Sequence, residues 1–220
     1  MLVLSSCNNW MRAAFDEVEK LFNMDVIQLV VLTDSEAATE NVVETTLVSD
    51  WRYKNDQWVR RCRIVAKEFK TNSTDESNFP PTSSFAFVRM LLVFAASYGL
   101  AITALDVKDA LLTVLQVEAI HGRIANWIRE WAGNRSTHWL LKRCLPGQRN
   151  AALRWHQHIG QLCEQSKIEA FPGAPTVFRR KDVNRKLYAN IHVDDIFSGV
   201  QARGCAVVSD YGGSNVDYEG

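Results

Sequence analysis

Apolar residues recur at helical spacing in several segments of the chain. In residues 10–22 the apolar positions fall three and four apart, with charged residues on the opposite face, which predicts an amphipathic helix. Residues 85–98 are almost continuously apolar and are followed by Gly99, a pattern that predicts a buried helix ending at the glycine. Residues 120–131 and 150–167 carry apolar stripes of the same period, so we expect two further helices whose stripes face the core.

Extended segments in the first third of the chain predict one short strand and one hairpin. Residues 26–32 form a short apolar run typical of a strand, whereas the polar and acidic residues 33–41 predict a loop. Residues 46–53 and 58–67 have extended character, and the four residues between them favour a tight turn. We therefore expect an antiparallel hairpin here.

The later part of the chain predicts a capped helix start and three strands. Residues 71–84 are rich in Pro, Ser, Thr and Asn, which predicts a loop whose last serines cap the following helix. A strand is expected at residues 101–107. In residues 186–193 apolar and polar residues alternate, as in a half-buried strand, and residues 196–200 can pair back on it.

Composition bounds the core and the overall charge. With 220 residues, 47% of them apolar, the chain can bury one sizeable core or two small ones. The formal net charge is zero, so the bulk charge gives no support for nucleic-acid binding, which depends largely on neutralised phosphates. Any basic surface must be local, although a run of charge is more often a solvated face. Two clusters qualify: Arg60, Arg61, Arg63, Lys67 and Lys70, and then Arg179, Arg180, Lys181, Arg185 and Lys186.

Cysteine usage and the start of the chain favour an intracellular protein. The five cysteines are odd in number and have none of the close spacing of zinc or redox sites, so we expect reduced thiols. The first residues lack the charged leader and the long apolar run of a secretory signal. The apolar stretch 85–107 is interrupted by Arg89 and Gly99, and a helix running into a strand explains it better than a membrane span. We expect no membrane partner, and the pattern does not distinguish cytoplasm from nucleus.

Two of the expected strands end on aspartates. Asp106 ends the strand at 101–107, and Asp194 and Asp195 lie at the turn between the last two strands. Neighbouring carboxylates repel each other and are costly near an apolar sheet unless a cation or hydrogen bonds compensate. Mg²⁺ is a natural compensator because it prefers oxygen ligands. Aspartate is also a common turn residue, so the Asp-Asp pair taken alone favours an ordinary turn.

Four short blocks occur in a fixed order along the chain. They are R-I-V-A-K-E-F at residues 63–69, L-D-V-K-D-A-L-L at 105–112, L-P-G-Q-R-N-A-A-L-R-W at 145–155 and V-D-D-I at 193–196. Each resembles a block of the reverse transcriptase domain of copia-type (LTR) retrotransposon Pol polyproteins. The segment V-R-M-L-L at 88–92 also resembles the helix before the first catalytic strand of that family. The resemblance covers about residues 43–200 and is specific because the four blocks occur together.

The resemblance implies an α+β fold of reverse-transcriptase-like fingers and palm, in which an antiparallel palm sheet packs on helices and a thumb is absent. We expect an N-terminal extension without family resemblance at residues 1–42, and a fingers-like hairpin and loop at 43–84. The palm with the catalytic aspartates is expected at residues 85–203, and a disordered tail at 204–220.

The resemblance also implies a function, that of an RNA-directed DNA polymerase of a transposable element that spreads by DNA integration. Nucleotidyl transfer to a primer 3′-hydroxyl would use two Mg²⁺ ions. The partners would be an RNA or DNA template with its primer, deoxynucleoside triphosphates and other parts of a Pol polyprotein. The alternative is a non-catalytic retrotransposon remnant that acts as a nucleic-acid or protein binding module.

Site residues carried over from the family fall into three groups. Asp106, Asp194 and Asp195 would be catalytic and bind metal, and the carbonyl of Val107 would complete the coordination. The nucleotide-binding candidates are Arg63, Lys67, Asp109, Ala110, Leu111, Gln148 and Arg149, and the primer-contacting candidates are His192 and Val193.

These assignments have plain structural alternatives. Arg63 and Lys67 equally suit an exposed strand of alternating charge, the turn at 146–149 suits an ordinary helix start, and Asp109 suits an acid at a helix N-terminus.

The chain departs from the family pattern at three of these positions and at Glu68. His192 stands where the family has an aromatic residue, and Leu111 stands where a flat aromatic screens the sugar 2′ position. Glu68 replaces a glycine and Asp109 a threonine. These departures, the zero net charge and the absence of a thumb after residue 200 predict a weak or inactive polymerase even with an intact metal site.

Overall fold

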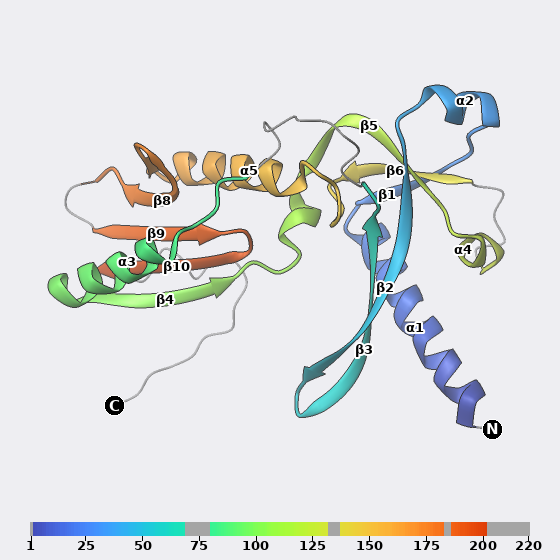
Figure 1. The fold of residues 1–220 in the computed structure, drawn as a ribbon, viewed down its shortest axis with the longest axis horizontal. Helices are drawn as coiled ribbons and strands as arrows, with labels where there is room; N and C mark the ends of the chain where they lie inside the picture. Colours follow the sequence, from blue (N-terminus) through green and yellow to red (C-terminus); the bar gives the residue numbers. More distant parts are fainter. Residues whose placement is uncertain (1, 69–79, 132–136, 183–185, 202–220) are drawn as a thin grey trace. The chain divides into compact units, whose positions relative to one another are not determined.

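The structure, a computed structural model, describes residues 2–68, 80–131, 137–182 and 186–201, and it has a mixed α/β architecture with two five-stranded sheets (Figure 1). It divides into two compact units. Unit 1 comprises Met1–Phe79 and Asp109–Trp155, and unit 2 comprises Pro80–Lys108 and His156–Gly220. Residues 109–155, which the expected boundaries place in the palm, therefore belong to unit 1. The expected tail and most of the loop at 71–84 lie outside the described residues.

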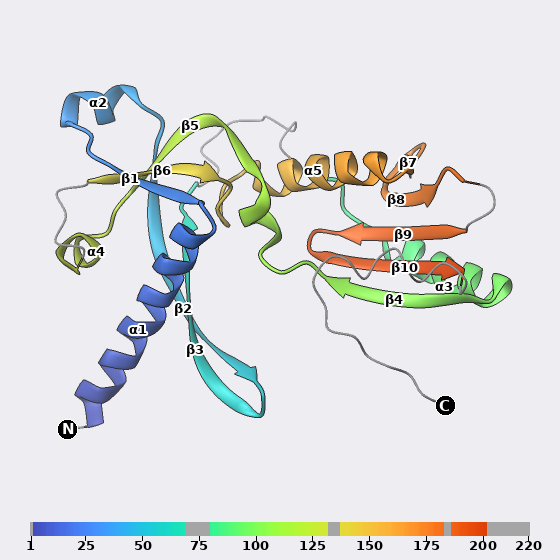
Figure 2. The same cartoon turned by 180° about the vertical axis from the view of Figure 1, so that it is seen from behind.

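The sheet of unit 1 has the strand order β1-β6-β5-β2-β3. Strands β2 and β5 are parallel, and the other pairs are antiparallel. Helix α1 packs along β3 (Figure 2). The strands are β1 (Ile27–Val30), β2 (Val42–Lys54), β3 (Gln57–Ala66), β5 (Leu115–Arg123) and β6 (His138–Arg143), and the helices are α1 (Leu2–Asn23), α2 (Asp34–Thr39), η2 (Ala110–Thr113), α4 (Asn126–Trp131) and the start of α5 (Ala151–Gln165).

One hydrophobic core holds unit 1 together. The apolar face of α1, through Val18 and Leu21, packs against buried side chains of the sheet such as Trp139. This confirms the amphipathic helix and the short first strand that the pattern predicted. The expected hairpin is also confirmed: β2 pairs with β3 around a two-residue turn in which Asn55 and Asp56 both have positive φ, which favours this residue pair.

Two expectations for unit 1 are wrong. Residues 33–41 contain α2 rather than a loop, because Thr33 and Glu36 form a reciprocal capping box that satisfies backbone donors of this short helix. Residues 120–131 are not one helix: β5 extends to Arg123, and α4 begins at Asn126. Ile124 and Ile128 are nevertheless buried in the core, so the apolar spacing identified core positions but not their backbone conformation.

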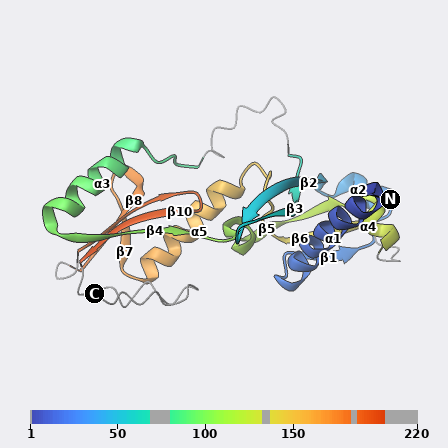
Figure 3. The same cartoon turned by 90° about the horizontal axis from the view of Figure 1, so that it is seen from below.

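The sheet of unit 2 is entirely antiparallel, with the order β4-β10-β9-β8-β7. Helix α3 covers one face, since a Cβ at Gly199 would meet Leu91 and Ala95 (Figure 3). Residues Ile159 and Cys163 of α5 pack against the core on the other face. The elements are α3 (Phe85–Tyr98), β4 (Leu100–Asp106), β7 (Ile168–Phe171), β8 (Ala174–Arg180), β9 (Leu187–His192) and β10 (Asp195–Gln201).

The helix α3 has the expected ends, capped by the Ser84 side chain and stopped by Gly99 in the left-handed conformation. It is not a buried helix, however, because only Leu91 and Ala95 of its residues are buried. A single helix on a sheet buries one stripe, so the rest of its apolar surface stays exposed. Strand β4 follows directly, and no helix among the described residues is long and apolar enough to cross a membrane.

The turn at residues 145–148 closes the unit 1 core against the end of β3. The Ala66 amide donates to the Pro146 carbonyl at 2.8 Å, and Gly147 has a φ of +89°. A Cβ at Gly147 would clash with the Ala66 carbonyl oxygen. Only glycine therefore fits this close backbone approach.

We expect Gly147→Ala to lower the free energy of unfolding by about 2 kcal/mol or more, because it adds both a strained φ and a backbone clash. The matched control is Gly160→Ala in α5, where a Cβ meets nothing within 4 Å, and it should raise stability by up to about 1 kcal/mol. Urea denaturation of the three proteins measures both effects. Equal stability of the wild type and the Gly147 variant would contradict the role of this turn.

Candidate functional site

The aspartates that the sequence singled out meet at one end of the unit 2 sheet. Strand β10 pairs with β4 so that Asp195 lies directly opposite Asp106, and with β9 so that Asp195 also lies opposite His192. The Val107 amide donates to the Asp194 carbonyl at 2.8 Å. Asp106 and Asp194, 88 positions apart in the sequence (194 minus 106), therefore share one sheet end.

The turn between β9 and β10 is conformationally unusual. Val193 and Asp194 form its two central residues, and Val193 has a φ of +52°. A β-branched residue at positive φ is a genuine outlier, since its Cβ crowds the backbone. Such strain persists only where the surrounding structure imposes it, and it often marks functional sites.

Side-chain alternation places Asp106, Asp195 and His192 on the same sheet face as Gly199, which is the face that α3 covers further along the strands. Asn190, two residues before His192 and 1% exposed, exchanges hydrogen bonds with the Ser83 hydroxyl at 2.7 and 2.9 Å. This pair ties the loop before α3 to the strand that carries the turn. Periodicity gave no sign of it, because Asn190 occupies a position expected to be polar and solvated.

The donor set at this sheet end suits a hydrated divalent cation. Asp106, Asp194 and Asp195 are all exposed, so water solvates them and the fold itself requires no cation there. Opposite residues of an antiparallel pair have Cα atoms about 4.5–5.5 Å apart, which lets the carboxylates of Asp106 and Asp195 reach one ion. Mg²⁺ usually takes one or two carboxylates and completes its shell with water and phosphate. Among the described residues no cluster of three or more His, Cys, Asp or Glu could hold a metal ion, and the register brings two carboxylates, Asp106 and Asp195, opposite each other.

The nucleotide-binding candidates lie in unit 1. The Arg63 guanidinium forms a 3.0 Å ion pair with Asp50 of the adjacent strand, so its charge is already matched. Lys67 is exposed just after the end of β3, and no carboxylate of the described residues pairs with it. Of the two cations carried over on this strand, Lys67 is therefore the more available to an anion.

Gln148 has a structural task in the 145–148 turn. It is 6% exposed, and its carbonyl oxygen accepts hydrogen bonds from the Leu145 amide at 2.6 Å and from the Gln116 side chain at 2.9 Å. Arg154 in turn donates to Gln116 at 3.0 Å. The Nε2 group of Gln148 is buried without a hydrogen-bond partner among the described residues. A ligand contact by Gln148 would have to use this amide group.

Glu68, noted in the sequence only as a departure from the family pattern, supports the same turn. Its carboxylate accepts the Arg149 amide hydrogen bond at 2.8 Å. A glycine at position 68 would leave this donor to water. The turn that carries Gln148 and Arg149 is therefore held to the β3 end by two contacts, one from Ala66 and one from Glu68.

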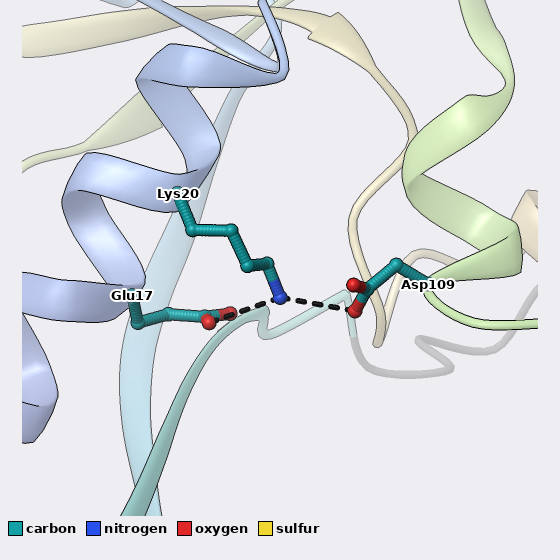
Figure 4. A network of polar contacts seen from close by, with 3 residues as sticks. All are labelled: Glu17, Lys20 and Asp109. Atoms are coloured by element: carbon teal, nitrogen blue, oxygen red, sulfur yellow. Dashed lines mark hydrogen bonds and ion pairs between the residues drawn. The ribbon is translucent and has the colours of Figure 1, made fainter. Parts of the chain in front are cut away.

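Asp109 is anchored by the N-terminal helix. The Lys20 ammonium lies 2.9 Å from the Asp109 carboxylate and 3.1 Å from that of Glu17, so one cation bridges two acids (Figure 4). Asp109 has a φ of +55°, a conformation that aspartate tolerates and that this ion pair helps to hold. Burial raises the pKa of Glu17, and the charge and hydrogen bond of Lys20 oppose this only in part. Sequence periodicity placed Lys20 on the polar face of a helix and gave no sign of this partner.

The candidates thus form two groups. Unit 2 holds Asp106, Val107, His192, Val193, Asp194 and Asp195, and unit 1 holds Arg63, Lys67, Asp109, Ala110, Leu111, Gln148 and Arg149. Ala110 is buried in η2 and Leu111 beside it is half-buried.

Residues 27–211 match the protein family described as reverse transcriptase (RNA-dependent DNA polymerase). The match is longer than the segment of about residues 43–200 that carries the family-like blocks. It includes β1 and α2 at its start but not α1. A search of curated proteins gave no match.

The raised pKa of Glu17 predicts a pH-dependent stability. A carboxyl whose folded pKa exceeds its unfolded value contributes stability that is fully present below the unfolded value of 4.5 and is lost as the pH rises through the folded pKa. Replacing Glu17 by Gln should therefore leave a protein whose stability relative to the wild type increases as the pH rises above about 4.5. Denaturant unfolding between about pH 4 and 8 measures this, with Glu19→Gln, an exposed acid on the same helix, as the control. A constant difference across this range would contradict the burial effect.

Proposed function

Because the chain belongs to the reverse transcriptase (RNA-dependent DNA polymerase) family, we propose that it is an RNA-directed DNA polymerase of a copia-type retrotransposon Pol polyprotein. The observation that supports this most is the pairing of Asp106 opposite Asp195, beside the Val107–Asp194 hydrogen bond, in a chain matched over residues 27–211. The four blocks of copia type, in their family order, support the finer assignment.

In this proposal the sheet end of unit 2 is the catalytic centre. Asp106 and Asp195 bind Mg²⁺ from one sheet face, Asp194 acts from the adjoining turn, and the Val107 carbonyl contributes a neutral oxygen. Two bound ions would lower the pKa of the primer hydroxyl and neutralise charge on the leaving pyrophosphate. His192, opposite Asp195, and Val193, at the exposed turn, are placed in the proposal to contact the primer end.

The residues of unit 1 are proposed to bind the incoming deoxynucleoside triphosphate. Lys67 is assigned the phosphate contact because it is exposed and unpaired among the described residues, whereas Arg63 shares its charge with Asp50. The segment from Asp109 to Leu111 is assigned the triphosphate and sugar, and the Gln148–Arg149 turn the base and template. The β2–β3 hairpin would then belong to the fingers and the antiparallel sheet to the palm.

Primer extension tests the catalytic assignment. On an RNA template with a DNA primer, Mg²⁺ and deoxynucleoside triphosphates, Asp106→Asn and Asp195→Asn should each lower the rate by at least about a hundredfold, because each removes a charged metal ligand. Asp16→Asn, an exposed acid of α1, is the matched control. We expect slow synthesis by the wild type that weakens further between about 50 and 150 mM salt, because a chain of zero net charge makes few phosphate contacts. If both site variants retain synthesis at the wild-type rate, the proposal is wrong.

The sugar assignment has its own test. Leu111 is branched and compressible, so it should exclude a ribose 2′-hydroxyl poorly, and Leu111→Phe should improve deoxyribonucleotide selection about tenfold. The ratio of kcat/KM for the two sugars measures this. Leu115→Phe, at a side chain that is 64% exposed, controls for adding an aromatic ring nearby in the sequence. Equal ratios before and after the Leu111 change would refute the assignment of this position.

A further inference from the structure

The outer half of the β2–β3 hairpin carries a face made of aromatic and basic side chains. Trp51 lies opposite Arg60, and Tyr53 lies opposite Trp58. Opposite side chains in an antiparallel pair point to the same side, and residues two apart on a strand share a face. These four side chains, which we call the hairpin face, therefore form one continuous surface.

The rings of the hairpin face are open to solvent. Trp51, Tyr53 and Trp58 are 51%, 56% and 66% exposed, although Trp10 of α1 packs edge-on against Trp51 with ring centroids 5.4 Å apart. Tyr53 and Trp58 contact each other with ring centroids 5.3 Å apart, so the two most exposed rings support one another. Three large exposed aromatic side chains side by side are unusual in a protein surface without a ligand to cover them.

The cation of the hairpin face, Arg60, contacts aromatic rings rather than acidic side chains. The Arg60 guanidinium lies 4.6 Å from the centroid of Trp51 and 5.6 Å from that of Trp10. No carboxylate of the described residues forms an ion pair with Arg60, Arg52 or Lys54. Residues 51–60 contain three cations and one acid, a net charge of +2 (three minus one) in a chain whose net charge is zero, but of the three cations only Arg60 lies on the hairpin face.

We propose that the hairpin face is a binding site for single-stranded nucleic acid, an inference that deepens the proposed function. Unpaired bases stack on Tyr53 and Trp58, and Arg60 attracts the phosphates. Arg52 and Lys54 add positive charge from the other side of the hairpin. Exposed rings beside a cation that pairs with no acid of the described residues are the combination that single-stranded nucleic acid needs, because every base has a ring face and every nucleotide a charge. A duplex hides its base faces and would use only the charge.

The composition of the hairpin face also separates this occupant from a lipid surface. It contains two Trp, one Tyr and one Arg but no aliphatic side chain, whereas the nearest exposed aliphatic residue, Val59, lies opposite Arg52 on the other side of the hairpin. Membrane-binding faces combine aromatics with aliphatic residues that enter the acyl region. The hairpin face offers stacking surface and charge only.

Fluorescence anisotropy of a labelled oligo-dT with the full chain, without Mg²⁺ or nucleotides, tests the site. Trp58→Ala should weaken binding about tenfold or more, and Trp58→Phe should restore it to within about threefold of the wild type, because stacking needs a ring and not an indole. Phe85→Ala, which removes an aromatic side chain 82% exposed on α3, is the matched control and should bind normally. Arg60→Gln should reduce the salt dependence, with a slope of log Kd against log salt lower by about 0.7.

Several outcomes would overturn the inference. Unchanged oligo-dT binding by a folded Trp58→Ala protein would do so, and so would equal losses in the Trp58 and Phe85 variants. If the Trp58→Ala protein loses binding to anionic phosphatidylserine vesicles but keeps its binding to oligo-dT, the hairpin face is assigned to lipid instead. If Trp58→Ala unfolds the hairpin, the Trp58→Phe and Arg60→Gln proteins still decide the question. Because the assay involves no synthesis, a chain without polymerase activity that binds oligo-dT through Trp58 supports the inference while contradicting the proposed function.

Discussion

The register of β10 between β4 and β9 is the constraint on which the candidate catalytic centre depends. Its buried face fixes that register, because Ile191 and Val200 belong to the core against which Ile159 of α5 packs. A slip by one residue would turn these apolar side chains to the other face and move Asp195 away from Asp106. Apolar burial on one face of the sheet thus holds two exposed carboxylates, 89 positions apart (195 minus 106), in position on the other.

Unit 1 positions its candidate residues by polar contacts from elsewhere in the unit. Glu68 holds the Arg149 amide, and Lys20 of α1 holds Asp109. Glu68 and Asp109 are positions where the chain departs from the copia-type pattern, and both departures are matched by a partner within the unit. Lys20 lies before residue 27, where the family match begins, so a helix outside the matched range supports a turn inside it.

Local sequence patterns succeeded where a segment's structure depends on its nearest neighbours. The turn at Asn55 and Asp56 and the end of α3 at Gly99 follow from backbone preferences of single residues. The pattern was wrong at residues 33–41, where a single capping box stabilises a short helix. It was also wrong at residues 120–131, where β5 pairs with β6 although the apolar residues have helical spacing. The sequence pattern did not predict strands β7 and β8, because they form an irregular hairpin in which apolar and polar residues alternate only weakly.

The sequence by itself determined the family, the three aspartates and most of the elements that carry them, because residue type and order are local properties. The register of β2 against β3, and not the sequence pattern, brought the aromatic residues of the hairpin face together. Only the tertiary structure decided that Asp195 is the residue opposite Asp106, that Gln148 is buried and that Lys20 pairs with Asp109. These depend on which distant segments pack together, and packing depends on the burial of whole faces rather than on any short run of residues.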